Sequence, residues 1–321
     1  MKKMNETTRR AIAVCALSVL NGTLLALLRM NILFGSSYIP STGLYPEGTH
    51  TSAFETGLIV LSLSLMNYGF LFSSRGRRYE FVRLPVAGTF AGGLAGFGML
   101  ALGVSVFISA KISGESLTRF DSILVILSLV CAASFLMEAF SGEEKLSPDG
   151  VSVLMLFRPI CCLFISFYFY FDSTTVIHDS NKKMAILFFA AVLLSLLYEV
   201  KMRVTRARTS TFVILNALSL CYGIMYAVPG IVWYFASGEA LVLSVFFDVA
   251  VLFLSVWCAV RLISLTSRTD TDGAEAPETA EAPEITEASE TAVEQTECGS
   301  EAGSAETTAA EENTEEGETE I

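Results

Sequence analysis

Eight apolar stretches within the first 268 residues restrict the fold more than any other feature of the chain. We place them near residues 11–34, 53–72, 85–109, 121–140, 151–171, 184–202, 210–235 and 239–265. A helix needs about 20 apolar residues to cross a bilayer core of about 30 Å. The stretches lack the polar face that a surface helix of a soluble protein carries. The sequence therefore predicts an all-α integral membrane protein, built as a bundle of about eight transmembrane helices.

The last two apolar stretches and the first one each allow two interpretations. Only residues 236–238 separate the seventh and eighth stretches, which predicts a tight hairpin; a single re-entrant element there would instead give seven spans. The first stretch follows a basic segment, residues 1–10, as the apolar core of a signal peptide would. However, the stretch is long and no small-residue cleavage site follows it. We therefore interpret it as an uncleaved first helix.

Charge divides the chain into a body and a tail. Of its 33 acidic residues, 18 lie within residues 269–321, which contain no Lys or Arg. Between residues 275 and 290 a Glu occurs at every third position, with mainly Ala, Thr, Pro and Ser between. A segment of low hydrophobicity and high net charge stays disordered. The sequence thus predicts a transmembrane domain over 11–268 and a disordered, Glu-rich cytoplasmic tail over 269–321.

The basic residues predict the orientation. With the N-terminus inside, 15 Lys and Arg residues flank the inner helix ends and five flank the outer ends, Arg29 among the five. An excess on the cytoplasmic side is the usual pattern. We therefore expect a multi-pass protein of the cell membrane with both termini in the cytoplasm. The basic inner loops at 75–83 and 201–208 are expected to attract anionic lipid head groups. Trp257, near an inner helix end, is expected to be an interfacial anchor.

Ionisable residues within the apolar stretches are candidates for a functional site, because charge is costly in lipid. Arg158 lies in the fifth stretch, Asp248 near the middle of the eighth, and Glu138 close to the inner end of the fourth. These three are the predicted ligand-binding residues. Arg158 needs a partner, and Glu138 is favoured over Asp248 because the fourth and fifth helices are an adjacent antiparallel pair. The alternative is an ion pair that only joins helices. Glu138 and Glu199, close to inner helix ends, are expected to snorkel to the interface in this alternative.

Two prolines predict helix breaks. Pro159 directly follows Arg158, and Pro229 is followed by Gly230. Proline lacks an N–H group and so leaves one backbone carbonyl of its helix without a donor. In transporters, broken helices beside intramembrane charge form the substrate site. The alternative is a kink that serves packing alone.

Glycines in the third stretch predict close helix packing. Gly88, Gly92 and Gly96 recur every four residues, so they share one face of a helix. Such a flat surface lets another helix approach closely. The neighbouring helix belongs either to the same chain or to a second copy in a homo-oligomer.

No motif predicts a chemical activity. Six of the seven cysteines lie inside apolar stretches and none is in a C-x-x-C motif, so we expect no metal site and no cofactor. Catalytic motifs are absent, which argues against an enzyme, and no nucleic-acid partner is expected.

The sequence leaves two hypotheses for the function. The chain is a transporter or permease-like protein for a small solute, with Arg158 and both proline sites facing one water-filled space, or it is a non-catalytic scaffold or signalling subunit acting through its cytoplasmic loops and tail.

Overall fold

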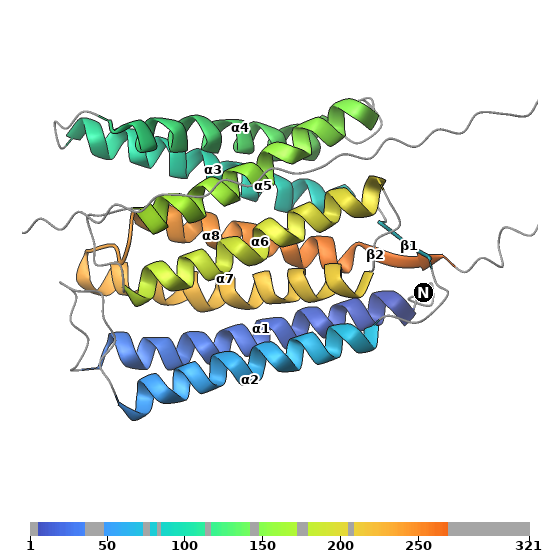
Figure 1. The fold of residues 1–321 in the computed structure, drawn as a ribbon, viewed down its shortest axis with the longest axis horizontal. Helices are drawn as coiled ribbons and strands as arrows, with labels where there is room; N and C mark the ends of the chain where they lie inside the picture. Colours follow the sequence, from blue (N-terminus) through green and yellow to red (C-terminus); the bar gives the residue numbers. More distant parts are fainter. Residues whose placement is uncertain are drawn as a thin grey trace, which may run out of the picture. The chain divides into compact units, whose positions relative to one another are not determined.

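The computed structural model describes residues 6–35, 48–72, 78–81, 85–112, 117–141, 148–171, 179–204 and 209–268 (Figure 1). The helices in this part of the chain are α1 (Glu6–Leu33), α2 (Thr49–Phe72), α3 (Pro85–Ile112), α4 (Arg119–Ser141), α5 (Pro148–Phe171), α6 (Ser180–Val204), α7 (Thr209–Ser237) and α8 (Val245–Ile263). All except α5 are long and apolar enough to span a membrane, and α5 contains a shorter apolar part, Met155–Phe171. The predicted all-α membrane bundle is confirmed.

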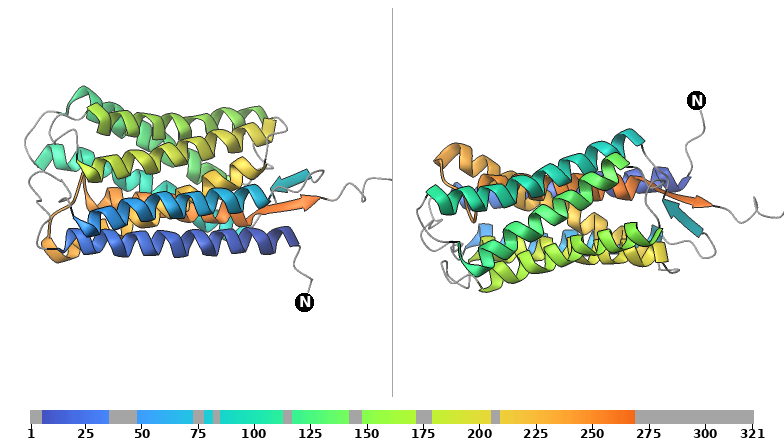
Figure 2. Two further views of the ribbon diagram at one scale, coloured as in Figure 1. Left: turned by 60° about the horizontal axis from the view of Figure 1, so that its bottom comes forward. Right: turned by 90° about the horizontal axis from the view of Figure 1, so that it is seen from above.

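Six of the helices close a ring. Each helix from α3 to α8 packs against the next in the chain, and α8 packs in turn against α3. Outside the ring, α1 packs along α7, and α2 packs against both of them. Figures 1 and 2 show α1 and α2 side by side. The interior of the ring is therefore enclosed by helices, and it is where the buried polar side chains described below collect.

The connection between α7 and α8 differs from the predicted tight hairpin at 236–238. Helix α7 extends to Ser237. The next residue, Gly238, has a φ of 77°, a left-handed conformation that favours glycine and ends the helix. Helix α8 starts only at Val245, after Ser244, whose hydroxyl accepts a hydrogen bond from the Phe247 N–H at 3.3 Å. Residues 238–244 thus join two separate helices, which excludes the single re-entrant element.

Two four-residue strands, β1 (Arg78–Phe81) and β2 (Leu265–Arg268), were not predicted. They pair antiparallel, with Arg78 opposite Arg268 and Phe81 opposite Leu265. Pairs this short and this distant in sequence leave no recognisable pattern. The strands mark one end of the bundle, which we call the strand end (right in Figure 1), and the α7–α8 connection marks the opposite end, the hairpin end. The predicted tail, 269–321, and parts of both basic loops lie outside the described residues.

The three glycines predicted to share one face of α3 have different neighbours. A Cβ atom on Gly96 would lie 2.7 Å from the Leu136 side chain of α4, and one on Gly92 would lie 3.1 Å from Ala139 and from Trp257. These two glycines therefore allow α3 to pack closely inside the ring. A Cβ atom on Gly88 would meet nothing within 4 Å. A second copy of the chain as the neighbour of α3 remains a prediction.

Candidate functional site

Four charged side chains meet inside the ring near the strand end. They come from four helices: Glu138 of α4, Arg158 of α5, Glu199 of α6 and Arg261 of α8. Arg158 Nη1 lies 2.5 Å from Glu138 Oε2, and Arg261 Nη2 lies 3.5 Å from Glu138 Oε1 and also pairs with Glu199. The two positive and two negative charges cancel. We call this group the strand-end network.

Arg158 has further contacts that fix its guanidinium group. Its Nε donates to the Ser134 hydroxyl and its Nη2 to the Ser134 carbonyl, both at 2.8 Å. The group also lies 4.2 Å from the ring centroid of Phe135 and 5.5 Å from that of Trp257, within range of cation–π attraction. Only 1% of Arg158 is exposed. Its charge is neutralised, hydrogen-bonded and shielded.

The strand-end network settles several predictions about pairing. Arg158 contacts Glu138, the favoured partner, and not Asp248. The expectation that Glu138 and Glu199 snorkel to the interface is wrong, because both are directed into the network: Glu138 pairs with Arg158, and Glu199 is 3% exposed and pairs with Arg261. Trp257 is also 3% exposed, and its ring packs edge-on against Phe135, so its prediction as an interfacial anchor is wrong. The binding of a ligand by these residues stays a prediction.

A second group of polar side chains lies near the hairpin end and includes Arg29 of α1. Arg29 is fully buried, so counting it among the outer flanking charges was wrong. Its Nη1 donates to the carbonyls of Tyr226 at 2.8 Å and Met225 at 3.2 Å, and its Nη2 donates to Asn181 Oδ1 at 2.8 Å. In an unbroken helix the N–H of residue 229 would bond the Met225 carbonyl. Pro229 has no N–H, and Arg29 supplies a donor instead.

The start of α6 positions the acceptor for Arg29. Asp179 precedes α6, and its Oδ1 accepts a hydrogen bond from the Asn181 N–H at 2.8 Å, which caps the helix. Burial raises the pKa of the Asp179 carboxyl, although the Asn181 N–H and the positive charges of Lys182 and Arg29 lower it. Arg29, Asp179, Asn181, Lys182 and Asp248 form what we call the hairpin-end network.

Asp248 occupies the first turn of α8, not the middle of a helix, because α8 begins later than predicted. The residue is 3% exposed. Its carboxyl group lies against Gly230 of α7, where an added Cβ atom would be 2.5 Å from Oδ2. The positive charge of Arg29 acts on it. Pro229 and Gly230 thus have distinct roles: Pro229 leaves a carbonyl free for Arg29, and Gly230 leaves space for the Asp248 carboxyl group.

Both α7 and α5 continue as helices through their prolines, so Pro159 and Pro229 do not break them.

A band of thiols and hydroxyls lies between the two networks. Cys161 contacts Cys131, Cys162 lies close to Cys131 and Cys258, and Cys258 contacts Ser195 and Ser219. These residues come from α4, α5, α6, α7 and α8, so the band crosses the interior of the ring. We call it the thiol–hydroxyl belt. Within the described residues, no group of three or more potential ligands is arranged to hold a metal ion.

Aromatic rings separate the belt from the hairpin-end network. Phe247 of α8 lies at their centre, with ring centroids 5.0 Å from Phe169, 5.6 Å from Phe189 and 5.9 Å from Tyr226. The four side chains come from α5, α6, α7 and α8. This aromatic layer closes the interior of the ring on that side of the belt.

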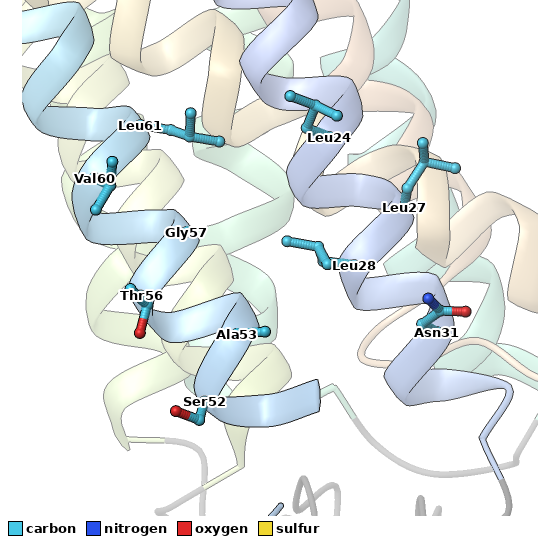
Figure 3. A pocket seen from close by; sticks show the side chains of 10 residues that line it. All are labelled: Leu24, Leu27, Leu28, Asn31, Ser52, Ala53, Thr56, Gly57, Val60 and Leu61. Atoms are coloured by element: carbon cyan, nitrogen blue, oxygen red, sulfur yellow. The ribbon is translucent and has the colours of Figure 1, made fainter. Parts of the chain in front are cut away.

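A separate groove lies between α1 and α2 on the outside of the ring (Figure 3). It has a volume of about 690 Å³ and is mostly apolar. In Figure 3, Leu28 of α1 and Leu61 of α2 point into the space between the two helices. Because many apolar side chains of α1 and α2 are exposed, the groove is a recess in a surface that lipid covers.

Comparisons with protein-family models, curated proteins and solved structures found no match. The two buried networks and the thiol–hydroxyl belt between them are therefore the candidate functional site. Two of its charged residues, Arg29 and Arg261, were missed by the sequence analysis. Both lie inside apolar stretches, and that position was the signal that could have identified them.

Proposed function

We propose that the chain is a transporter for a small polar solute, and that the strand-end and hairpin-end networks are the two gates of its pathway. The observation that supports this proposal is the polar content of the ring interior. A charged network lies at each end, and between them the hydroxyls of Ser195 and Ser219 lie beside the thiols of the belt. Secondary transporters bind their solutes near the membrane midplane, between gates of this kind.

The two gates share helices, which suggests how they alternate. Helix α6 contributes Asn181 to one network and Glu199 to the other, and α8 contributes Asp248 and Arg261 in the same way. A shift of α6 and α8 against the remaining helices would separate the contacts at one end while keeping those at the other. The strand-end network contains two positive and two negative charges, so it can close without stranding a charge. Alternating access requires such a two-state element.

A non-catalytic scaffold is the second candidate, and one observation favours it. The Arg158 guanidinium is 1% exposed and already contacts Glu138, Ser134 and two aromatic rings, so a solute does not reach it in this conformation. In a scaffold that state would be permanent, and the partner surface would be supplied by the cytoplasmic loops and the tail.

Thiol accessibility separates the two functions. Cys161 and Cys162 are 0% and 1% exposed, and they lie in the belt. Intact membranes would be treated with a small, impermeant, water-soluble thiol reagent, and the modified sites would be identified by mass spectrometry. A transporter exposes the belt to water whenever one gate opens, so both thiols should become labelled with time. Glu199→Gln, which weakens the strand-end network, should accelerate the labelling, and Glu6→Gln on the surface of α1 should not.

Two other cysteines of the chain are internal controls. Cys221 of α7 is also 0% exposed but does not belong to the belt, so its labelling would indicate unfolding. Cys298 of the tail reports that the reagent reaches the cytoplasmic side in inverted vesicles. Labelled Cys298 with unlabelled Cys161 and Cys162, from both sides of the membrane, would reject the transporter and favour the scaffold.

A further inference from the structure

We infer that Asp248 is a proton-binding site, and that its proton sets the state of the hairpin-end gate. The inference rests on the proposed transport function for the role of the proton, but the binding itself is a property of the carboxyl group and can be tested alone. It deepens the proposed function by naming the coupling ion.

The surroundings of Asp248 lack the groups that normally hold a buried carboxylate. The side chain is 97% buried, and no hydrogen-bond donor or ion-pair partner among the described residues contacts its oxygen atoms, although Ser244 accepts from the Asp248 backbone N–H. On the α7 side the carboxyl group faces Gly230, which offers it only van der Waals contact. Arg29, the cation that acts on it, directs its own N–H groups to two carbonyls and Asn181.

An ionised carboxylate in this position would be poorly compensated. A buried carboxylate without hydrogen bonds is strongly disfavoured, and such groups take up a proton instead. The N-terminal turn of α8 offers a favourable dipole, but this effect is smaller than the desolvation of an unpaired charge. A protonated carboxyl group is neutral and suits the contact with Gly230.

A proton fits this site better than a metal cation. A cation such as Na⁺ or Ca²⁺ needs several oxygen ligands around it. The Met225 and Tyr226 carbonyls, which precede Pro229 on α7, already accept from Arg29, whose charge also repels a cation. A proton needs neither a ligand shell nor space.

The proton changes the attraction between two helices of the gate. When ionised, Asp248 of α8 is attracted to Arg29 of α1; when protonated, it is not. The other charged and titratable groups at this end would modulate the titration. They include Tyr226 on α7, Lys111 on α3, Asp179 and Lys182 at the start of α6, Glu239 in the α7–α8 connection, Arg119 and Asp121 at the start of α4, and His50 and Glu55 in the first turns of α2.

Infrared spectroscopy of the full chain in lipid vesicles tests the proton directly. A protonated carboxyl group shows a C=O stretch that ionised carboxylates lack and that shifts in D₂O. We expect this band in the wild type at about pH 5, where an ordinary aspartate is ionised, and we expect it to weaken as the pH rises. Asp248→Asn should abolish it, and Glu239→Gln, at an exposed acid of the same end, should retain it. Asp248→Ser provides a second variant should Asp248→Asn fail to fold.

Thermal unfolding gives an independent readout. A carboxyl group that is neutral when buried but ionised in the unfolded chain binds more protons in the folded state. Its contribution to stability is present at low pH and lost as the pH rises. The melting temperature of the wild type should therefore fall relative to that of Asp248→Asn as the pH increases.

The possible outcomes are distinct. Loss of the band in Asp248→Asn, with the expected melting difference, supports the proton site. An unchanged infrared spectrum together with parallel melting profiles overturns it, because Asp248 would then be a carboxylate. A confirmed proton site with unlabelled belt cysteines would leave proton binding standing and reject the transport function.

Discussion

Removing Arg158 alone should destabilise the protein strongly, because the strand-end network would keep its other three charges. In Arg158→Leu, Arg261 remains with both Glu138 and Glu199, so one negative charge is left uncompensated in the interior. The Ser134 hydroxyl and carbonyl also lose the hydrogen bonds that they accept from Arg158. Breaking a buried ion pair by removing one partner costs about 3–5 kcal/mol. At about 2–4 °C per kcal/mol for a protein of this size, the melting temperature should fall by about 6–20 °C.

A double variant separates the stranded charge from lost packing. Arg158→Leu with Glu138→Leu removes one positive and one negative charge and leaves the pair of Arg261 and Glu199 intact. The double variant should therefore be more stable than Arg158→Leu. We expect a coupling energy of about 1–3 kcal/mol between the two positions.

Tryptophan fluorescence provides a local assay. The chain has two tryptophans, Trp233 and Trp257. In a Trp233→Phe background Trp257 is the sole tryptophan, and it lies 5.5 Å from the guanidinium of Arg158 and 5.0 Å from that of Arg261. Its emission during heating in detergent or nanodiscs would report the melting of the strand-end network itself.

A surface pair is the matched control. Arg10 lies 2.5 Å from Glu6 on α1, but its side chain is 43% exposed. Solvent screens such a pair, so Arg10→Leu should cost about 0–1 kcal/mol. The reasoning would be refuted if Arg158→Leu melted with the parent, or if the double variant were no more stable than the single one.

Two further predictions concern α7 and use the same melting assay. Gly223→Ala would place a Cβ atom 1.7 Å from the Ser255 hydroxyl and should lower the free energy of unfolding by about 1–3 kcal/mol. The control Gly88→Ala, whose Cβ atom would meet nothing within 4 Å, should be neutral or slightly stabilising. Equal effects of the two substitutions would contradict the packing around Gly223. Arg29→Met should cost about 1–3 kcal/mol because the Met225 carbonyl loses its donor, and adding Pro229→Ala should recover part of the loss by restoring an N–H. A double variant as unstable as Arg29→Met would show that Arg29 does not replace the missing donor.

The sequence predicted the helical bundle because apolar length is a local property of the chain. Each stretch of about 20 apolar residues fixes a helix regardless of its neighbours. The pairing of Arg158 with Glu138 was also accessible, since α4 and α5 are consecutive and antiparallel. Contacts between distant segments were not accessible. The strands β1 and β2 and the contact from Arg29 to α7 join parts of the chain separated by more than 180 residues, and no local pattern encodes them.

The depth of a charge depends on where its helix begins, and this explains the error at Asp248. The apolar stretch from residue 239 gave no signal of the true start, since residues 240–243 are nearly as apolar as the helix. The start is fixed instead by the Ser244 cap and by the hydrogen bond between Ser244 and Ser105 of α3. Moving the start to Val245 shifts Asp248 from the helix centre to the first turn, beside Arg29 and Gly230. One capping residue thus places this carboxyl group near the hairpin end, away from Arg158, and each end of the ring has its own charged network.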